Sequence, residues 1–304
     1  MSAAPSDPPA RSAGAEWTRR AERGSVFLIR FIVWFARRAG RAPARALLRV
    51  VTAYFFLSAR AARRASRDYL ARCLGRPATW AEQYRHFFAF ASATLDRVFF
   101  LEDRFDLFDI TVHGGDLFDA RGAVLMGGHL GSFEAMRSLG RGRSRAVAMA
   151  MYEENARKVQ SALAAIAPER VDDIVALGRL DSMLRLTERL EAGALVGVLA
   201  DRTLGDEPVL RVPFLGAPAP FPTGPMRMAA VLRTRVLFMA GLYRGGNRYE
   251  VHFEPLADFT AIEHLGRAER TALIEGAVSA YARRLEHHCR TAPDNFFNFY
   301  GFWS

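Results

Sequence analysis

The sequence contains only two cysteines among its 304 residues. Two thiols are too few for the disulfide framework that stabilises small secreted domains, so a reducing compartment fits the chain. The chain also begins without the apolar segment that a secretory signal carries, and its first fifteen residues are rich in Ala, Pro and Ser. We therefore expect residues 1–20 to form a disordered tail.

The sequence also lacks a run of roughly 20 apolar residues, the length that a helix needs to cross a bilayer. The apolar stretch over 25–35 is shorter and contains Arg30, and a second stretch over 46–57 contains Arg49. Aromatic and aliphatic side chains beside clustered arginines are typical of helices that lie in a membrane interface. A pair of buried core helices with solvated ends is the alternative interpretation.

A net positive charge is found only in the N-terminal quarter of the chain, since the remainder holds 26 basic and 28 acidic residues. The formal net charge is +10, but residues 1–76 alone hold sixteen arginines and four acidic residues, a net charge of +12. Such a segment suits a polyanionic surface, either anionic lipid or nucleic acid. Its bulky aliphatic side chains and the lack of a recognisable binding motif argue against nucleic acid and favour an anionic membrane.

Several motifs of common enzyme classes are missing. There is no P-loop, no dinucleotide-binding fingerprint and no Gly-x-Ser-x-Gly nucleophile elbow. His287, His288 and Cys289 lie together late in a predicted helix, but adjacent residues of a helix point in different directions. Because no carboxylate is spaced along the sequence to join them, we expect no metal site, and nothing indicates a cofactor.

From residue 107 onward, apolar runs alternate with amphipathic segments. The expected strands are 123–126, 145–152, 174–177, 195–200, 209–214, 236–243 and 249–256, and the expected helices are 132–140, 154–166, 180–192, 225–234 and 268–289. The last two strands are joined by a short Gly-rich loop and read as an antiparallel hairpin. The alternation otherwise predicts an α/β fold with a mostly parallel central sheet flanked by helices.

The region before residue 107 reads as helical. Thr79 and Glu82 form a capping-box pattern that opens a long helix through about residue 100, with apolar side chains at helical spacing. We expect three parts in the chain: the tail at 1–20, basic amphipathic membrane-associated helices at 21–76, and one large α/β domain at 77–304.

The most informative stretch follows the first apolar strand. Gly127 and Gly128 precede His129, and a helical pattern begins near Ser132. If His129 lies in the turn, Glu134 in the first helical turn can reach it, hold one ring nitrogen and leave the other free as a base. A structural histidine is the alternative interpretation.

Three further polar positions follow predicted strands or open a helix. In an open α/β sheet, functional groups collect at the carboxyl ends of the strands, where Asn155 and Asp201 are expected. Thr223 opens a predicted helix, so backbone N–H groups beside it could bind an anion or a reacting oxygen. A helix cap would equally explain Asn155 and Thr223, and a cap or an ion pair would explain Asp201.

The block from Gly128 to Glu134, Gly-His-Leu-Gly-Ser-Phe-Glu, resembles the lipid A biosynthesis (late) acyltransferase family of the lysophospholipid-acyltransferase-like superfamily. His129 and Glu134 fall on the catalytic His-x4-Glu of that family. Asn155 follows the strand that falls on a Tyr-and-Asn block, and Asp201 falls on a functional aspartate. Counting back from Asp201 without gaps places Arg170 on a site arginine.

The resemblance implies an acyltransferase that moves an acyl chain from an acyl carrier protein or CoA thioester to a hydroxyl of a membrane lipid. In this mechanism His129 is the general base, Glu134 orients its ring, and Arg170 or backbone N–H groups at Gly131 and Ser132 stabilise the oxyanion. The mechanism needs no metal. The implied location is the cytoplasmic face of a bacterial inner membrane, reached peripherally or through one N-terminal anchor.

Two positions depart from the family pattern. The ending over 298–303 has no basic residue where the family has a basic cluster, and Arg202 follows Asp201 where the family has Gln or His. A basic cluster would suit an anionic acceptor, so the acceptor stays open between a lipid A-like and a pigment or aryl-polyene-type lipid. A catalytically inactive lipid- or carrier-protein-binding protein is one alternative. Phospholipid acylation is another, which Glu134 in place of Asp disfavours.

Overall fold

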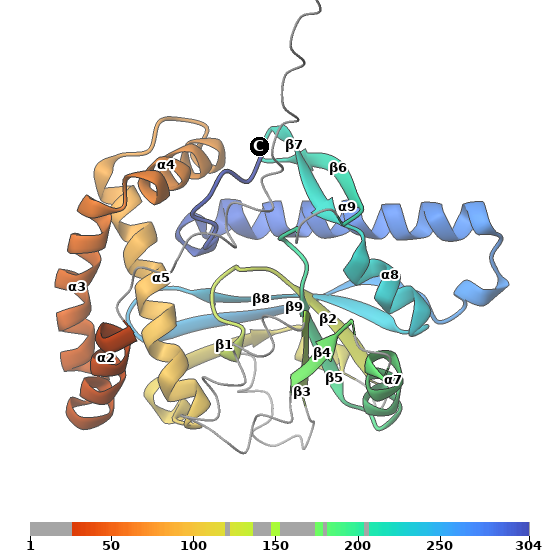
Figure 1. Cartoon of the computed structure of the whole chain (residues 1–304), viewed down its shortest axis with the longest axis horizontal. Helices are drawn as coiled ribbons and strands as arrows, with labels where there is room; N and C mark the ends of the chain where they lie inside the picture. Colours follow the sequence, from red (N-terminus) through yellow and green to blue (C-terminus); the bar gives the residue numbers. More distant parts are fainter. Residues whose placement is uncertain are drawn as a thin grey trace, which may run out of the picture.

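The computed structural model of the protein describes residues 26–118, 122–135, 147–152, 174–178, 181–203 and 207–303 (Figure 1). Its α-helices are α2 (Val26–Ala39), α3 (Arg41–Ser58), α4 (Arg60–Leu74), α5 (Trp80–Leu101), α7 (Ser182–Glu191), α8 (Gly224–Val231) and α9 (Arg267–Thr291). Its strands are β1 (Asp109–His113), β2 (Ala123–Gly127), β3 (Val147–Tyr152), β4 (Ile174–Leu177), β5 (Leu195–Leu199), β6 (Val209–Phe214), β7 (Ala217–Pro222), β8 (Arg235–Tyr243) and β9 (Arg248–Asp258). Short 3-10 turns cover Phe105–Leu107, Gly115–Leu117, Ile262–His264 and Pro293–Asn295.

Within the described part, seven strands form one sheet in the order β1-β9-β8-β2-β5-β3-β4, and β6 and β7 form a separate hairpin. Within the large sheet, β8 and β9 pair antiparallel, and the other neighbours pair parallel. The α/β fold with a mostly parallel central sheet is therefore confirmed, and so is the antiparallel hairpin of β8 and β9. The predicted helix over 154–166 lies outside the described residues, as do positions 136–140 of the helix predicted over 132–140.

Helices cover both faces of this sheet. Alternate side chains of a strand point to opposite faces, and β8 shows this division clearly. Phe238 lies in the same apolar cluster as Tyr281 of α9. Leu237, on the opposite face, lies in a different cluster together with Phe100 of α5. In Figure 1, α9 runs along β8 and β9 on one side, and α5 stands against the end of the sheet near β1. The strands between these helices are buried on both faces, which explains their nearly continuous apolar sequence.

The N-terminal helices are anchored to the rest of the protein by a buried ion pair. Arg41 at the start of α3 donates from Nε and Nη2 to the two carboxylate oxygens of Asp96 on α5, each over 2.7 Å. Tyr249 on β9 donates its hydroxyl to Oδ2 of the same carboxylate over 2.8 Å. Burial raises the pKa of Asp96, although Arg41 and Tyr249 act in the opposite direction. These contacts join α3, α5 and β9 at one point.

Most predicted elements agree with the structure to within two residues, and two strands were missed. The capping box is present, since the side chain of Thr79 accepts from the Glu82 N–H and the Glu82 carboxylate accepts from the Thr79 N–H. The missed strands are β1, whose side chains are mostly exposed, and β7. Prolines occupy every second position of β7, where their missing N–H groups can point away from β6.

Among the helices that the structure describes, from α2 at Val26 to α9, none combines the length and the apolarity that a membrane-spanning helix requires.

Candidate active site

His129 and Asp201 follow two strands that are neighbours in the sheet. Strands β2 and β5 pair parallel, and their last residues, Gly127 and Leu199, are partners in the register. His129 and Asp201 each lie two residues beyond those partners, so the parallel geometry brings them to the same edge. Nδ1 of His129 lies 2.9 Å from Oδ1 of Asp201. The carboxyl ends of the strands thus bear an imidazole and a carboxylate in direct contact, as expected for a site in this fold.

The second oxygen of Asp201 is also hydrogen-bonded. The side-chain amide of Asn298 donates to Oδ2 over 3.0 Å, and its carbonyl oxygen accepts from Nε of Arg202 over 2.8 Å. The Asp201 side chain is fully buried, whereas the side chain of His129 is 32% exposed. A buried carboxylate acceptor at Nδ1 places the ring proton there and leaves Nε2 as the unprotonated nitrogen.

The electrostatics of this pair favour a neutral imidazole beside an ionised carboxylate. Burial lowers the pKa of His129, an effect that Asp201 opposes and that the charges of Arg202 and Arg97 reinforce. Burial acts to raise the pKa of Asp201, but the His129 ring, Arg202 and the Asn298 hydrogen bond together bring it below its usual range. At neutral pH, His129 can therefore accept a proton while Asp201 keeps its negative charge.

Glu134 does not hold a ring nitrogen of His129 as expected, because Asp201 occupies Nδ1 and Glu134 pairs with other residues. Its Oε1 lies 2.5 Å from Nε of Arg97 on α5, and the hydroxyl of Ser132 lies 3.4 Å from its Oε2. Glu134 is buried and the Arg97 side chain is 46% exposed, so the carboxylate holds a guanidinium at the surface of the site. The positive charge of Arg97 also lowers the pKa of His129.

The C-terminal segment supports the turn that carries His129. The Phe297 N–H donates to the His129 carbonyl over 2.7 Å, and the Gly131 N–H donates to the Asn295 carbonyl over 2.8 Å. The Ser132 N–H donates to Gly241 on β8 over 2.7 Å. The N–H groups of Gly131 and Ser132 are thus engaged by the protein itself, contrary to the expectation that they stabilise an oxyanion.

Gly131 is the point of closest approach between this turn and the sheet. Its φ is +70°, and a Cβ at this position would overlap the carbonyl oxygen of Gly241. We expect Gly131→Ala to lower the free energy of unfolding by about 2–5 kcal/mol, because a left-handed backbone and a steric overlap both oppose the methyl group. Chemical denaturation measures this. Gly75→Ala is the control, since Gly75 has φ +65° with no described atom near its Cβ, and a loss as large there would contradict the steric argument.

The structure separates Thr223, another predicted site residue, from this pair. Thr223 occupies the N-cap position of α8, but its hydroxyl donates to the Pro208 carbonyl over 3.2 Å rather than to the helix. It lines a cavity of about 1060 Å³ between α8 and the start of α9, to which His129 does not contribute. Asn155 and Arg170 lie outside the described residues.

Sequence reasoning missed two residues of this site, Arg97 and Asn298. Arg97 lies within a long amphipathic helix, where an arginine reads as part of the solvated face. Asn298 lies in an ending noted only for its lack of basic residues. In both cases the partner is distant along the chain, at Glu134 and Asp201 respectively, so no local spacing reveals the contact.

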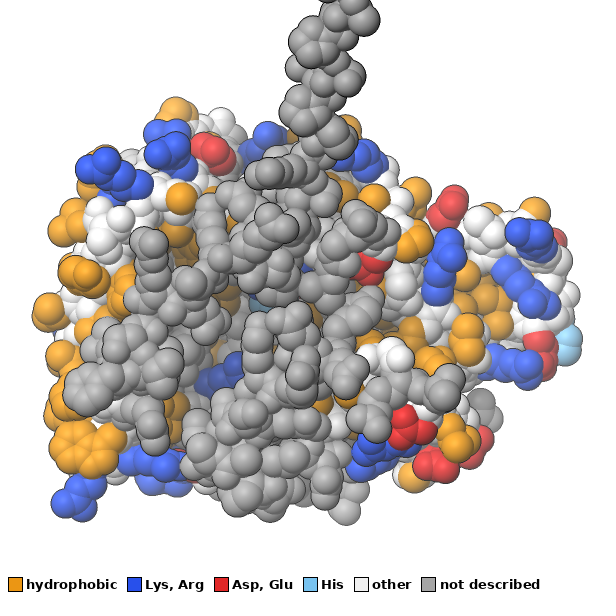
Figure 2. Space-filling view, viewed as in Figure 1, with side chains coloured by type: hydrophobic (Ala, Val, Ile, Leu, Met, Phe, Trp, Pro, Cys, Tyr) orange, Lys and Arg blue, Asp and Glu red, His pale blue; other side chains and the backbone are white. Residues whose placement is uncertain are grey.

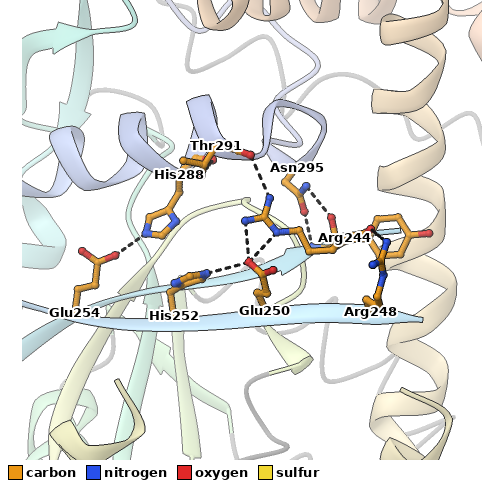
Figure 3. Close-up of polar contacts among 9 residues, drawn as sticks. Arg244, Arg248, Glu250, His252, Glu254, His288, Thr291 and Asn295 are labelled. Carbon is orange, nitrogen blue, oxygen red and sulfur yellow. Dashed lines mark hydrogen bonds and ion pairs between the residues drawn. The ribbon is translucent and has the colours of Figure 1, made fainter. Parts of the chain in front are cut away.

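A second polar cluster lies between β9 and the C-terminal end of α9 (Figure 3). Nε2 of His288 lies 2.6 Å from Oε1 of Glu254, and the rings of His288 and His252 are 4.8 Å apart between centroids. The expectation that no carboxylate joins His288 is therefore wrong. Glu254 comes from a different element and could not be found by spacing.

A model of the bacterial lipid A biosynthesis acyltransferases matches residues 14–303 of this sequence. The chain belongs to that family. A search among curated proteins found no significant match. Among solved structures, this family member is similar to the 1-acyl-sn-glycerophosphate (LPA) acyltransferase of Thermotoga maritima, with 17% identity and a TM-score of 0.38. That alignment covers 81% of this chain and 97% of the other.

Proposed function

We propose that this acyltransferase moves a fatty acyl chain from a thioester, carried by acyl carrier protein or by CoA, to a hydroxyl of a membrane lipid of the lipid A-like or of the pigment (aryl-polyene) type. The observation that carries the proposal is the hydrogen bond between His129 and the buried Asp201 at the carboxyl ends of β2 and β5. Membership of the family supplies the reaction class, acyl transfer. The donor, the acceptor and the roles of individual residues are part of the proposal.

In the proposed reaction, His129 acts as a general base through Nε2. The acceptor hydroxyl gives its proton to Nε2 while its oxygen attacks the thioester carbonyl. The new carbon–oxygen bond forms, the carbon–sulfur bond breaks, and the thiolate takes the proton from Nε2. Asp201 fixes the ring and stabilises its positive charge during the transfer, as an ionised carboxylate at Nδ1 does in related dyads and triads.

Arg97 and Glu134 have a different part in this proposal. Arg97 is half exposed, is held by the buried Glu134, and influences the titration of His129. A fixed positive charge beside the base can stabilise the negative oxygen that develops on the thioester carbonyl. Glu134 then acts as a positioning residue for Arg97. Arg170, which the family pattern places at the site, is a further candidate oxyanion donor.

The test of the reaction uses purified full-length protein in detergent with labelled acyl thioesters and a total bacterial lipid extract. Carrier-protein and CoA thioesters are supplied in parallel reactions, and mass spectrometry identifies the labelled lipid. A labelled glycolipid or pigment lipid would support the proposal, whereas a labelled phospholipid would favour the phospholipid alternative. Absence of transfer from both donors, with membrane binding retained, would favour an inactive binding protein.

The pKa of His129 sets the expected pH dependence. Because the base must be unprotonated and burial lowers its pKa, kcat/KM should fall only below the usual histidine value of 6.5. The carboxylate Asp201 stays ionised throughout this range, since its pKa is also lowered. A pH profile of kcat/KM between pH 4.5 and 8 measures the acidic limb. An acidic limb centred above pH 7 would contradict the assignment.

We further propose that α2 and α3 rest on the cytoplasmic surface of the bacterial inner membrane. Figure 2 shows hydrophobic side chains gathered along the edge that these helices form, with basic side chains near both ends. The exposed apolar residues there are Phe31, Trp34, Val50, Tyr54 and Leu57. Apolar side chains beside arginines suit an interface of acyl chains and anionic headgroups.

We expect the double substitution Trp34→Ser with Tyr54→Ser to weaken binding to anionic vesicles by roughly tenfold or more, since each ring removed forfeits buried apolar area. Cosedimentation with phosphatidylglycerol-containing vesicles measures the change. The matched control is Leu184→Ser with Val231→Ser, two apolar residues of similar exposure on α7 and α8. Equal weakening by both pairs would contradict the assigned face.

A further inference from the structure

The polar cluster beneath the end of α9 is distinct from the His129 site in both residues and elements. Strand β9 points Glu250, His252 and Glu254 toward α9, because residues two apart share a face of the sheet. His288, in the last turn of α9, meets this row, and His113 on β1 is the register partner of His252. Figure 3 shows His252, Glu254 and His288 converging between the strand and the helix.

These side chains are close enough to share one ion. Among the described residues, the possible ligand atoms of His252, Glu254 and His288 all lie within 4.8 Å of one another. Ligands of a tetrahedral zinc ion at about 2.0–2.2 Å from the metal stand roughly 3.3 Å apart, so shifts of about an ångström or less would form the site. His113, Glu250 and His252 form a second, more exposed group of the same compactness.

One nitrogen of the cluster lacks a hydrogen-bond partner. Nε2 of His252 is buried, and none of the described residues forms a hydrogen bond with it. Its only recorded polar contact among the described residues is a long ion pair with Oε2 of Glu250, at 3.5 Å (Figure 3). Buried polar atoms are nearly always satisfied, so an unsatisfied imidazole nitrogen among histidines and carboxylates points to a ligand that completes it.

We propose that His252, Glu254 and His288 bind one divalent transition-metal ion of the zinc type. Two imidazoles and one carboxylate suit such an ion, whereas magnesium and calcium prefer oxygen ligands alone. The group of His113, Glu250 and His252 is the weaker candidate for a metal site. Arg244 already donates a hydrogen bond to Glu250 over 2.8 Å, and His113 is exposed. Water would complete the coordination, because His252 and Glu254 are only partly buried.

The charges around the three ligands allow this assignment. Arg284 pairs with the other oxygen of Glu254 over 2.9 Å, but its side chain is half exposed. Such partly exposed pairs contribute little, so Arg284 can stay on that oxygen or release it when the metal binds.

Binding of the ion is expected to stabilise the folded protein. His288 lies one turn before the segment that leads to Asn295 and Asn298, and the ion would tie this end of α9 to β9. A ligand that binds only the folded state stabilises it by mass action, so zinc at a hundred times its dissociation constant should raise Tm by about 5 °C. This readout does not depend on catalysis.

The test uses tag-free, full-length protein in detergent, stripped by a chelator and titrated with Zn²⁺ by calorimetry. We expect one ion per chain, and His288→Gln should weaken binding by at least about 100-fold. His287→Gln is the matched control, because this neighbouring histidine is exposed and outside the cluster. Cobalt substitution should give the visible absorption of a four-coordinate site in the wild type and in His287→Gln, but not in His288→Gln.

The proposal would be overturned if the wild type bound no stoichiometric zinc, or if His288→Gln and His287→Gln lost zinc affinity equally. It would also be overturned if His113→Gln weakened zinc binding and His288→Gln did not. If His288→Gln does not fold, Glu254→Gln tests the same site from β9. Melting curves in EDTA show whether each variant retains its fold before zinc is added.

Discussion

Replacement of His129 by glutamine is expected to lower kcat/KM for acyl transfer by on the order of 10²–10⁴, the contribution of a positioned proton acceptor. Glutamine keeps a polar side chain of similar size, and its amide can still donate to Asp201. It cannot accept a proton from the acceptor hydroxyl at neutral pH. The measurement is initial-rate kinetics with a labelled thioester and the lipid acceptor that the assay identifies.

The control for this substitution is His264→Gln, which alters an exposed histidine in the turn before α9. It should leave the rate unchanged. A His129→Gln variant that retains full activity, with membrane binding and Tm unaltered, would remove His129 from the mechanism. The reaction would then need another base at the carboxyl ends of the strands.

Asp201→Asn is expected to lower kcat by on the order of 10³–10⁴, as the loss of an orienting carboxylate does in comparable sites. An amide at this position can donate to Nδ1 and so favour the wrong tautomer of His129, with Nε2 protonated. It also removes the charge that raises the pKa of His129, so the acidic limb of the pH profile should move to lower pH. Both effects are measured in the same kinetic series.

Glu134→Gln is the decisive comparison for Asp201→Asn. In the structure Glu134 holds Arg97 rather than the imidazole. Glu134→Gln should therefore lower kcat at least about tenfold less than Asp201→Asn does, and it should not move the acidic limb of the pH profile in the same way. Equal losses with the same displacement of the acidic limb would show that Glu134 orients His129 during the reaction. The contact between Glu134 and Arg97 would then be confined to the free enzyme.

The local elements of this fold could be predicted because their signals are short-range. The predicted strands over 174–177 and 209–214 agree residue for residue with β4 and β6. Strand β7 was missed because three of its six residues are prolines, which normally argue against a strand. Only its pairing with β6 explains how they are tolerated. Edge strand β1 was missed because its exposed side chains show little apolar pattern.

The partners within the site could not be predicted, because they depend on the order of the strands. The sequence places His129 and Asp201 after two apolar strands, yet 72 positions separate them. Nothing local indicates that β5 lies beside β2. The nearer carboxylate, Glu134, was the natural choice by spacing, but the turn directs it to Arg97 on a helix that precedes the sheet.

We could infer from the sequence the family, the class of fold, most element boundaries and the turn that carries His129. These follow from motif spacing, from side-chain periodicity and from capping and glycine chemistry, all of which act over a few residues. Tertiary structure alone decided that Asp201 holds His129, that Asn298 supports Asp201, and that His252, Glu254 and His288 meet. Each of these contacts joins elements far apart in the chain, and only the packing of strands and helices brings them together.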